Sequence, residues 1–131
     1  MKRDLDRIRD ILIICEEDEK SRFSQSDPRF SDFDRHQIGL LSQAGYLEMH
    51  KPGYKTGSIP DNLGLASYGM HYFTITWTGH DYLDAIRNEG VWAKTKDIVA
   101  KEGGNMALEL VKALAVGFAK KQLEDRTGFK L

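Results

Sequence analysis

The strongest structural signal in this sequence is a change of hydrophobic period just after residue 75. Residues 70–75 (MHYFTI) are rich in aromatic and β-branched side chains, which predicts a strand. From residue 77 to 88 the apolar side chains recur at helical spacing instead. We therefore expect residues 75–80 (ITWTGH) to form a strand-to-helix joint.

Two threonines and a glycine in this joint have recognisable structural roles. Thr76 ends the strand and Thr78 stands three residues before Asp81, so either hydroxyl can cap the new helix. Gly79 costs helix stability relative to alanine, and the usual compensation is that a neighbouring backbone packs closely against it. These features therefore indicate that the joint has a structural role rather than a catalytic one.

His80 carries the competing interpretation, a catalytic or metal site. His80 and Asp84 are four residues apart and could share one helix face, and His71 lies on the preceding strand. A metal needs at least a third ligand, and the sequence has no second paired motif such as HExxH and no nucleophile elbow. We expect no enzyme activity, no metal and no cofactor, and a helix-end histidine with a structural hydrogen bond.

The remaining elements follow from periodicity and turn residues. They are a helix at 3–19, a short strand or extended loop at 21–31, a helix at 32–44, a strand at 46–50, and helices at 91–101 and 106–125. Ser31 or Asp32 caps the second helix and Gly45 stops it, while Gly103-Gly104-Asn105 caps the last helix. Prolines and glycines between the two strands predict a long hairpin tip, or wing. The expected fold class is α+β, mainly α.

Composition places the chain among ordinary globular proteins. Its 131 residues fit one compact unit, a core at 1–90 carrying C-terminal helices at 91–131. The net charge of -1 lacks the overall basic excess of strong nucleic-acid binders. The single Cys15 excludes an internal disulfide and is expected to be a buried structural thiol. No signal peptide or membrane span is visible, so the expected location is the cytoplasm and no membrane partner is expected.

Several short motifs resemble those of winged-helix proteins. The order of helix, extended segment, helix, two-stranded wing and helix is the winged-helix order. Residues 36–47 (HQIGLLSQAGYL) look like the pattern that closes the recognition helix in many bacterial regulators, and residues 75–80 resemble the LTxxG that follows their wing. With the opening MKRDLDRIR and residues 79–92 (GHDYLDAIRNEGVW), this combination resembles a family of small bacterial proteins of unknown function, frequent in phages and prophages.

The resemblance covers most of the chain, including residues 94–96 (KTK) and the two glycines before the final helix. It implies a winged-helix-like core with a two-stranded wing and a C-terminal helical extension, in a cytoplasmic, phage-derived accessory protein. It brings no catalytic residues. The sequence departs from a typical helix-turn-helix in having one clear helix, where two are expected, between the first helix and the wing.

DNA binding requires basic groups that neutralise phosphates and side chains that reach base edges. Helical geometry places Phe33, Leu40, Leu41 and Ala44 on one face of the second helix and Arg35, Gly39, Ser42 and Gln43 on the other. Asp32 and Asp34 at its start would repel phosphate. The candidates for DNA contact are Arg35, His36, Ser42, Gln43, Lys51, Tyr54 and Lys55. An ordinary solvated surface is the alternative for all of them.

The rival function is a protein-interaction module without DNA binding. Residues 110–119 (LVKALAVGFA) contain one charged side chain, so this stretch must be buried on several sides. It could pack within its own chain, or pair with a second copy through small residues such as Ala113 and Gly117. The candidate homodimer interface comprises Ile14, Leu110, Leu114, Val116 and Phe118. A host or phage protein is the other partner considered.

Overall fold

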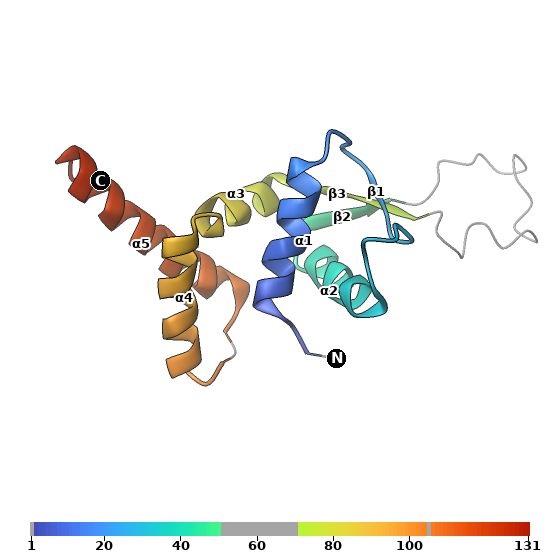
Figure 1. Ribbon diagram of the computed structural model, residues 1–131, viewed down its shortest axis with the longest axis horizontal. Helices are drawn as coiled ribbons and strands as arrows, with labels where there is room; N and C mark the ends of the chain where they lie inside the picture. Colours follow the sequence, from blue (N-terminus) through green and yellow to red (C-terminus); the bar gives the residue numbers. More distant parts are fainter. Residues whose placement is uncertain (1, 51–70, 105) are drawn as a thin grey trace, which may run out of the picture. The chain divides into compact units, whose positions relative to one another are not determined.

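The computed structural model describes residues 2–50, 71–104 and 106–131. Within these ranges the chain forms five α-helices and three short strands (Figure 1). They are, in order, α1 Leu5–Glu17, β1 Phe23–Ser24, α2 Asp32–Gln43, β2 Leu47–His50, β3 Tyr72–Ile75, α3 Trp77–Ile86, α4 Glu89–Lys101 and α5 Leu108–Thr127. The predicted fold class, α+β and mainly α, is confirmed.

The chain divides into two compact units, a first unit at residues 1–80 and a second unit at residues 81–131. The packing of the C-terminal helices on the core stays a prediction. No helix in the described ranges is long and apolar enough to cross a membrane.

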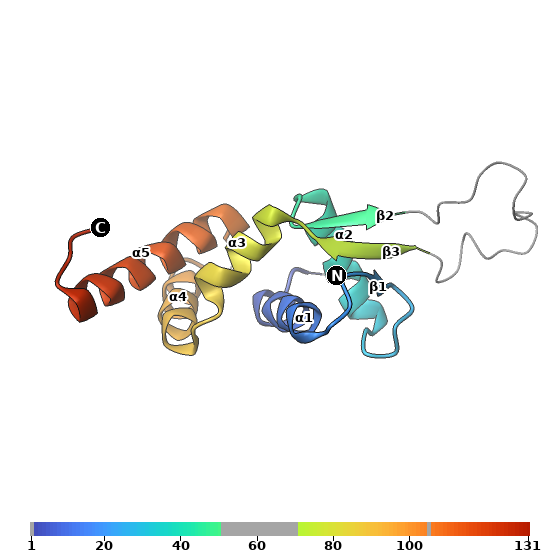
Figure 2. The same cartoon turned by 90° about the horizontal axis from the view of Figure 1, so that it is seen from above.

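The first unit is built on an antiparallel sheet in the order β1-β3-β2, so β3 is its central strand. Phe73 on β3 is fully buried, and its ring centroid lies 5.7 Å from that of Phe23 and 5.8 Å from that of Phe30. The two views show α1 and α2 beside this sheet (Figures 1 and 2). The tip of the predicted wing, between β2 and β3, lies outside the described residues.

The helix α1 is shorter than the predicted helix at 3–19 because aspartates close both ends. The Asp4 carboxylate accepts a hydrogen bond of 3.0 Å from the backbone N–H of Arg7, and Asp18 ends the helix in an extended conformation. The buried residues of α1 are Ile8, Ile11, Leu12 and Cys15. Burial raises the pKa of the Cys15 thiol to about 12, which agrees with the expected structural role.

The helix α2 buries only part of the predicted face, and Leu41 is the residue that both share. Its buried residues are Asp34, Gln37, Ile38 and Leu41. Phe33 and Leu40 are only half-buried, and Ala44 is exposed. The prediction used the spacing of apolar residues alone. The buried face also contains Asp34 and Gln37, because both side chains have hydrogen-bond partners in the N-terminal segment and α1.

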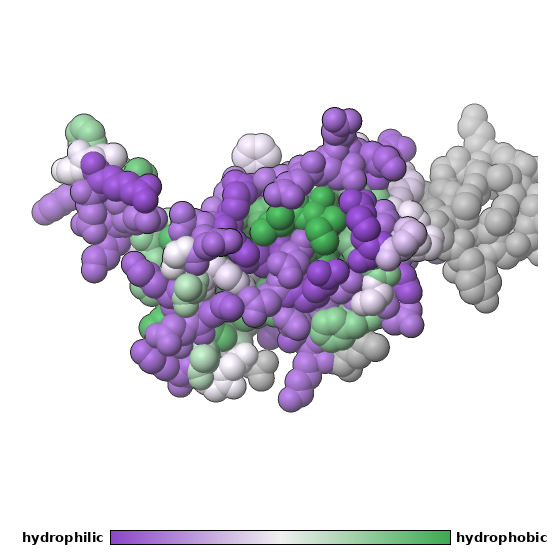
Figure 3. Space-filling model, viewed as in Figure 1, coloured by the Kyte–Doolittle hydropathy of each residue, from purple (hydrophilic) through white to green (hydrophobic). Residues whose placement is uncertain are grey.

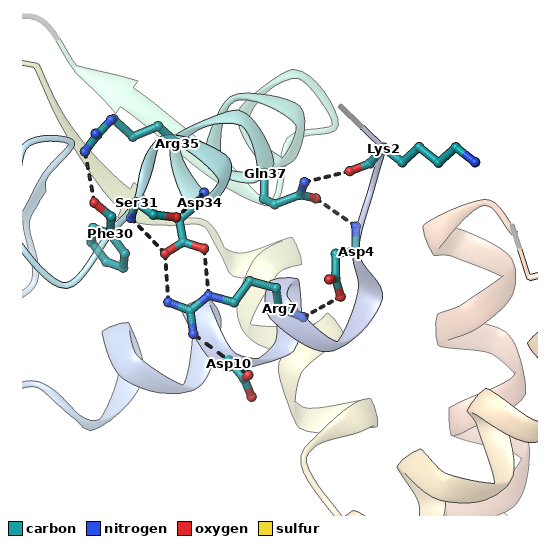
Figure 4. A network of polar contacts seen from close by, with 9 residues as sticks. All are labelled: Lys2, Asp4, Arg7, Asp10, Phe30, Ser31, Asp34, Arg35 and Gln37. Atoms are coloured by element: carbon teal, nitrogen blue, oxygen red, sulfur yellow. Dashed lines mark hydrogen bonds and ion pairs between the residues drawn. The ribbon is translucent and has the colours of Figure 1, made fainter.

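Those partners form one polar network between the start of the chain and α2 (Figure 4). The Arg7 guanidinium donates to both carboxylate oxygens of Asp34, from Nε at 2.6 Å and from Nη2 at 2.8 Å. The Gln37 amide donates to the Lys2 carbonyl at 2.8 Å and accepts from the Asp4 N–H at 3.0 Å. The network therefore fixes the N-terminal segment and α1 against α2.

Asp34 also closes the start of α2, where Ser31 is the N-cap. The two residues form a capping box, in which the Asp34 N–H donates to Ser31 Oγ at 3.2 Å and the Ser31 N–H donates to the Asp34 carboxylate at 3.0 Å. The hydrogen bond from Arg7 lowers the pKa of Asp34 to about 2. The Asp34 charge is therefore buried and paired with Arg7, whereas Asp32 is exposed, and the expected repulsion of phosphate stays a prediction.

The strand-to-helix joint is confirmed, with Thr76 rather than Thr78 as its cap. Thr76 Oγ1 accepts a hydrogen bond from the Gly79 N–H at 3.0 Å and donates one to the Gly45 carbonyl at 2.6 Å. The close backbone expected at Gly79 is that of Tyr46, because a Cβ on Gly79 would lie 2.0 Å from the Tyr46 carbonyl oxygen. The joint therefore locks the start of α3 onto the end of α2.

The end of α2 has the geometry that this lock requires. Gly45 has a φ of 85°, in the left-handed region that glycine adopts without strain. The Tyr46 N–H then donates back to the Leu41 carbonyl at 2.9 Å, which closes the helix. The prediction that Gly45 stops this helix is confirmed.

In the second unit, α4 starts before the predicted residue 91 because the Asn88 side chain caps it, accepting from the Val91 N–H at 3.0 Å. The two glycines assigned to the start of the last helix instead end α4. Gly104 has a φ of 85°, and its N–H donates to the Val99 carbonyl at 2.9 Å. The helix α5 follows Ala107 without a side-chain cap, and Asn105 lies outside the described residues.

Candidate nucleic-acid interface

The outer side of α2 presents a bare patch around Gly39. A Cβ on Gly39 would meet nothing within 4 Å, so packing inside the chain does not require glycine there. Glycine in the middle of a helix costs about 1 kcal/mol relative to alanine. Among the predicted DNA contacts near this patch, Gln43 is exposed and His36 and Ser42 are half-buried. The patch is therefore an open surface that the backbone of a partner could approach closely, with the ion pair of Arg35 and Asp32 on the same side of the helix.

Arg35 lies on the same helix but is engaged within the fold. Its Nη1 donates to the carbonyls of Gln25 at 3.2 Å and Phe30 at 3.0 Å, and its Nη2 pairs with Asp32. The guanidinium thus holds the turn before α2 against the first turn of that helix. These bonds give Arg35 a positioning role in the first unit.

The solvent side of the sheet carries a column of stacked side chains that sequence reasoning missed. The rings of His50 on β2 and Tyr72 on β3 stack with centroids 4.9 Å apart, and the Arg22 guanidinium lies 5.1 Å from the Tyr72 centroid. His50 Nε2 lies 3.1 Å from Thr74 Oγ1. The pairing of His50 with Tyr72 is the signal that could have revealed this column, but it depends on strand register. The column fixes β2 to β3 where the hairpin leaves the sheet.

The three predicted wing contacts, Lys51, Tyr54 and Lys55, lie outside the described residues.

The His80 side chain is half exposed in the first turn of α3. Its Nδ1 lies 4.0 Å from Glu16 Oε2, at the rim of a hollow of about 270 Å³ in the first unit. Asp84, the other residue of the alternative site, pairs with Arg87 at 2.9 Å. No group of three His, Cys, Asp or Glu side chains in the described ranges could hold a metal ion. The raised pKa of the Cys15 thiol beside this hollow is unfavourable for a nucleophile.

Comparison with known proteins places this fold in a family. The family described as "Hypothetical protein (DUF2513)" matches residues 2–105. The chain belongs to DUF2513. A relative from Haemophilus influenzae (strain ATCC 51907 / DSM 11121 / KW20 / Rd), titled "Uncharacterized protein", is 30% identical over 119 residues, covering 88% of this chain and 92% of the relative. No solved structure matches. The DUF2513 match spans the joint, α2 and α4 and ends before α5.

Proposed function

We propose that this DUF2513 protein is a non-enzymatic, winged-helix-like DNA-binding protein of a phage or prophage that acts in the cytoplasm as a transcriptional regulator. In this proposal the outer side of α2 faces a DNA groove and the hairpin that follows contacts the phosphate backbone. The observation that carries it is the hydrogen bonding between the residue that follows β3 and the two residues near the end of α2. Because Thr76, directly after β3, donates to the Gly45 and Tyr46 carbonyls, α2 and the strands β2 and β3 can engage one duplex together.

The element order supports the proposal. The hairpin of β2 and β3 directly follows α2, with β3 between β2 and β1, and resembles the recognition helix and wing of winged-helix proteins. The chain differs from a typical helix-turn-helix protein in having one helix, where two are expected, between α1 and the wing. The described segment between α1 and α2 contains β1 and turns but no helix. The bonds from Arg35 to Gln25 and Phe30 hold that segment in place.

In this proposal, α2 and the hairpin make different kinds of contact with DNA. The outer side of α2 offers the hydroxyl of Ser42 and the amide of Gln43, which can hydrogen-bond base edges. Phosphate contacts would come from Lys51 and Lys55 on the hairpin. Two such contacts give a slope of about −2 in a plot of log affinity against log salt concentration.

This proposal predicts that changing Lys51 and Lys55 together to Glu weakens duplex binding about tenfold or more and flattens the salt slope by about 2. The measurement is fluorescence anisotropy with random and genomic duplexes at low and moderate salt. Lys94→Glu with Lys130→Glu is the matched control, because both side chains are exposed in the second unit and the charge change is the same.

Changing Ser42 and Gln43 to Ala should reduce discrimination between duplexes and leave non-specific affinity nearly unchanged. A flat titration of the parent protein at low salt would remove DNA binding from consideration. Equal weakening by the two lysine double variants would show general charge attraction rather than a hairpin contact.

A second candidate is a protein-interaction module without DNA binding, and the surface of the C-terminal region favours it. Of the six exposed large apolar side chains in the described ranges, five lie within residues 108–131. Such a concentration marks an interaction surface. Under this alternative, changes on α5 would abolish partner binding, and the lysine changes on the hairpin would have no effect.

A further inference from the structure

The helix α5 leaves an apolar stripe exposed along most of its length. The exposed fractions are 58% for Leu110, 45% for Val116 and 49% for Leu123, and Ala113 and Gly117 on the same side are also exposed. The buried side of the helix comprises Leu108, Val111 and Ala115. On the face seen in Figure 3, the C-terminal end of α5 is mainly hydrophilic, with small green apolar patches at its edges. Of the predicted interface residues, Leu114 and Phe118 are half-buried, as is Ile14 in the first unit.

The two ends of the stripe differ in shape. Near its start lies an apolar hollow of about 310 Å³ lined by Ile98, Met106, Leu110, Ala113 and Leu114. Near its end Leu123 projects from the helix. Between them, a Cβ on Gly117 would meet nothing within 4 Å. One helix therefore carries a hollow, an open middle and a projecting side chain in sequence.

We propose that a second copy of this chain covers this stripe, with the two α5 helices antiparallel about a two-fold axis. A two-fold axis brings the end of each helix to the start of the other, so Leu123 of each copy lies level with the hollow of its partner along the helix axis. The register that places Ala113 opposite Val116 of the second copy also places residue 106, at the hollow, opposite Leu123.

Charge complementarity selects this arrangement over a parallel one. The same register brings Glu109 opposite Lys120 of the second copy, twice in the symmetric pair, and both side chains are exposed. It also places Lys112 opposite the open position at Gly117. A parallel pair would instead place Glu109 beside Glu109 and Lys120 beside Lys120, where like charges repel. The antiparallel pair is therefore favoured by charge.

The first test measures the molar mass of the full-length protein in solution by light scattering, at a protein concentration of tens of micromolar. We expect twice the mass of the 14.9 kDa chain. Leu110→Glu and Leu123→Glu should each give monomers that retain the helical circular dichroism spectrum. Trp77→Glu is the control, because Trp77 is 82% exposed outside α5, and this variant should remain dimeric. A monomeric parent, or dimers unaffected by both leucine changes, would overturn the proposal.

A charge exchange tests the register without removing apolar surface. Glu109→Lys and Lys120→Glu should each weaken the dimer about tenfold, because each places like charges opposite one another twice. An equimolar mixture of the two variants should restore dimer formation, since the heterodimer again pairs opposite charges. If the mixture is as weak as either variant alone, the antiparallel register is wrong.

Discussion

Gly79→Ala is expected to lower the free energy of unfolding by about 3 kcal/mol, the largest effect of a single methyl group that we expect in this chain. The added Cβ would lie 2.0 Å from the Tyr46 carbonyl oxygen and 2.9 Å from Ile75 Cγ2. The Tyr46 oxygen belongs to a backbone that is itself held by the Thr76 N–H at 3.2 Å, so it cannot move aside freely. Alanine gains about 1 kcal/mol in helix propensity, which is too little to offset such a clash.

Urea denaturation would measure this effect, with two controls in the same unit. Gly39→Ala should stabilise the protein by up to about 1 kcal/mol, because that position is open and the propensity gain is unopposed. His80→Ala should change stability by less than about 0.5 kcal/mol, since its side chain is half exposed. A Gly79→Ala variant as stable as the parent would show that the joint does not fix α3 to the end of α2.

Asp34→Asn is expected to cost about 2 to 3 kcal/mol near pH 7, because it leaves the Arg7 guanidinium without its charged partner. The Asp34 side chain is 4% exposed and receives two hydrogen bonds from that guanidinium. Asp32→Asn is the matched control in the same helical turn. Its carboxylate is 88% exposed, so its pairing with Arg35 should contribute less than about 0.5 kcal/mol.

The pH dependence of the Asp34 effect has a defined sign. The pKa of Asp34 is lowered from 3.8 to about 2 in the folded protein, so the folded state favours the charged carboxylate. Its stabilisation of about 2 kcal/mol is present above pH 4 to 5 and is lost as the pH falls toward 2. The difference in unfolding free energy between the parent and Asp34→Asn should therefore shrink as the pH falls through this range. A difference that stays constant from pH 7 to pH 2 would exclude the ion pair as its source.

The sequence predicted those features that depend on neighbouring residues. The change of period after residue 75, the stop at Gly45 and the need for a close backbone at Gly79 all follow from local geometry. The assignment of the two glycines at 103–104 failed because glycine can either end one helix or precede the next, and the hydrogen bond to Val99 decides between them.

The features that could not be predicted depend on contacts between distant parts of the chain. Asp34 and Gln37 are buried because they pair with residues 27 and 33 positions away, which apolar periodicity cannot reveal. The position of Arg35 suggested a DNA contact, whereas its carbonyl partners become visible only when the preceding turn folds back. In the candidate interface, the side of α2 around Gly39 is open. The contacts by Lys51, Tyr54 and Lys55 stay predictions.

We propose above that α2 and the adjoining hairpin form a DNA-binding surface. Backbone amide chemical shifts of the isotope-labelled protein, followed during titration with duplex DNA at low salt, test it most directly. We expect the shifts to change along residues 36–43 and along β2 and β3, and to stay constant along α5. Shifts that remain constant throughout the first unit, or that change only along α5, would contradict it.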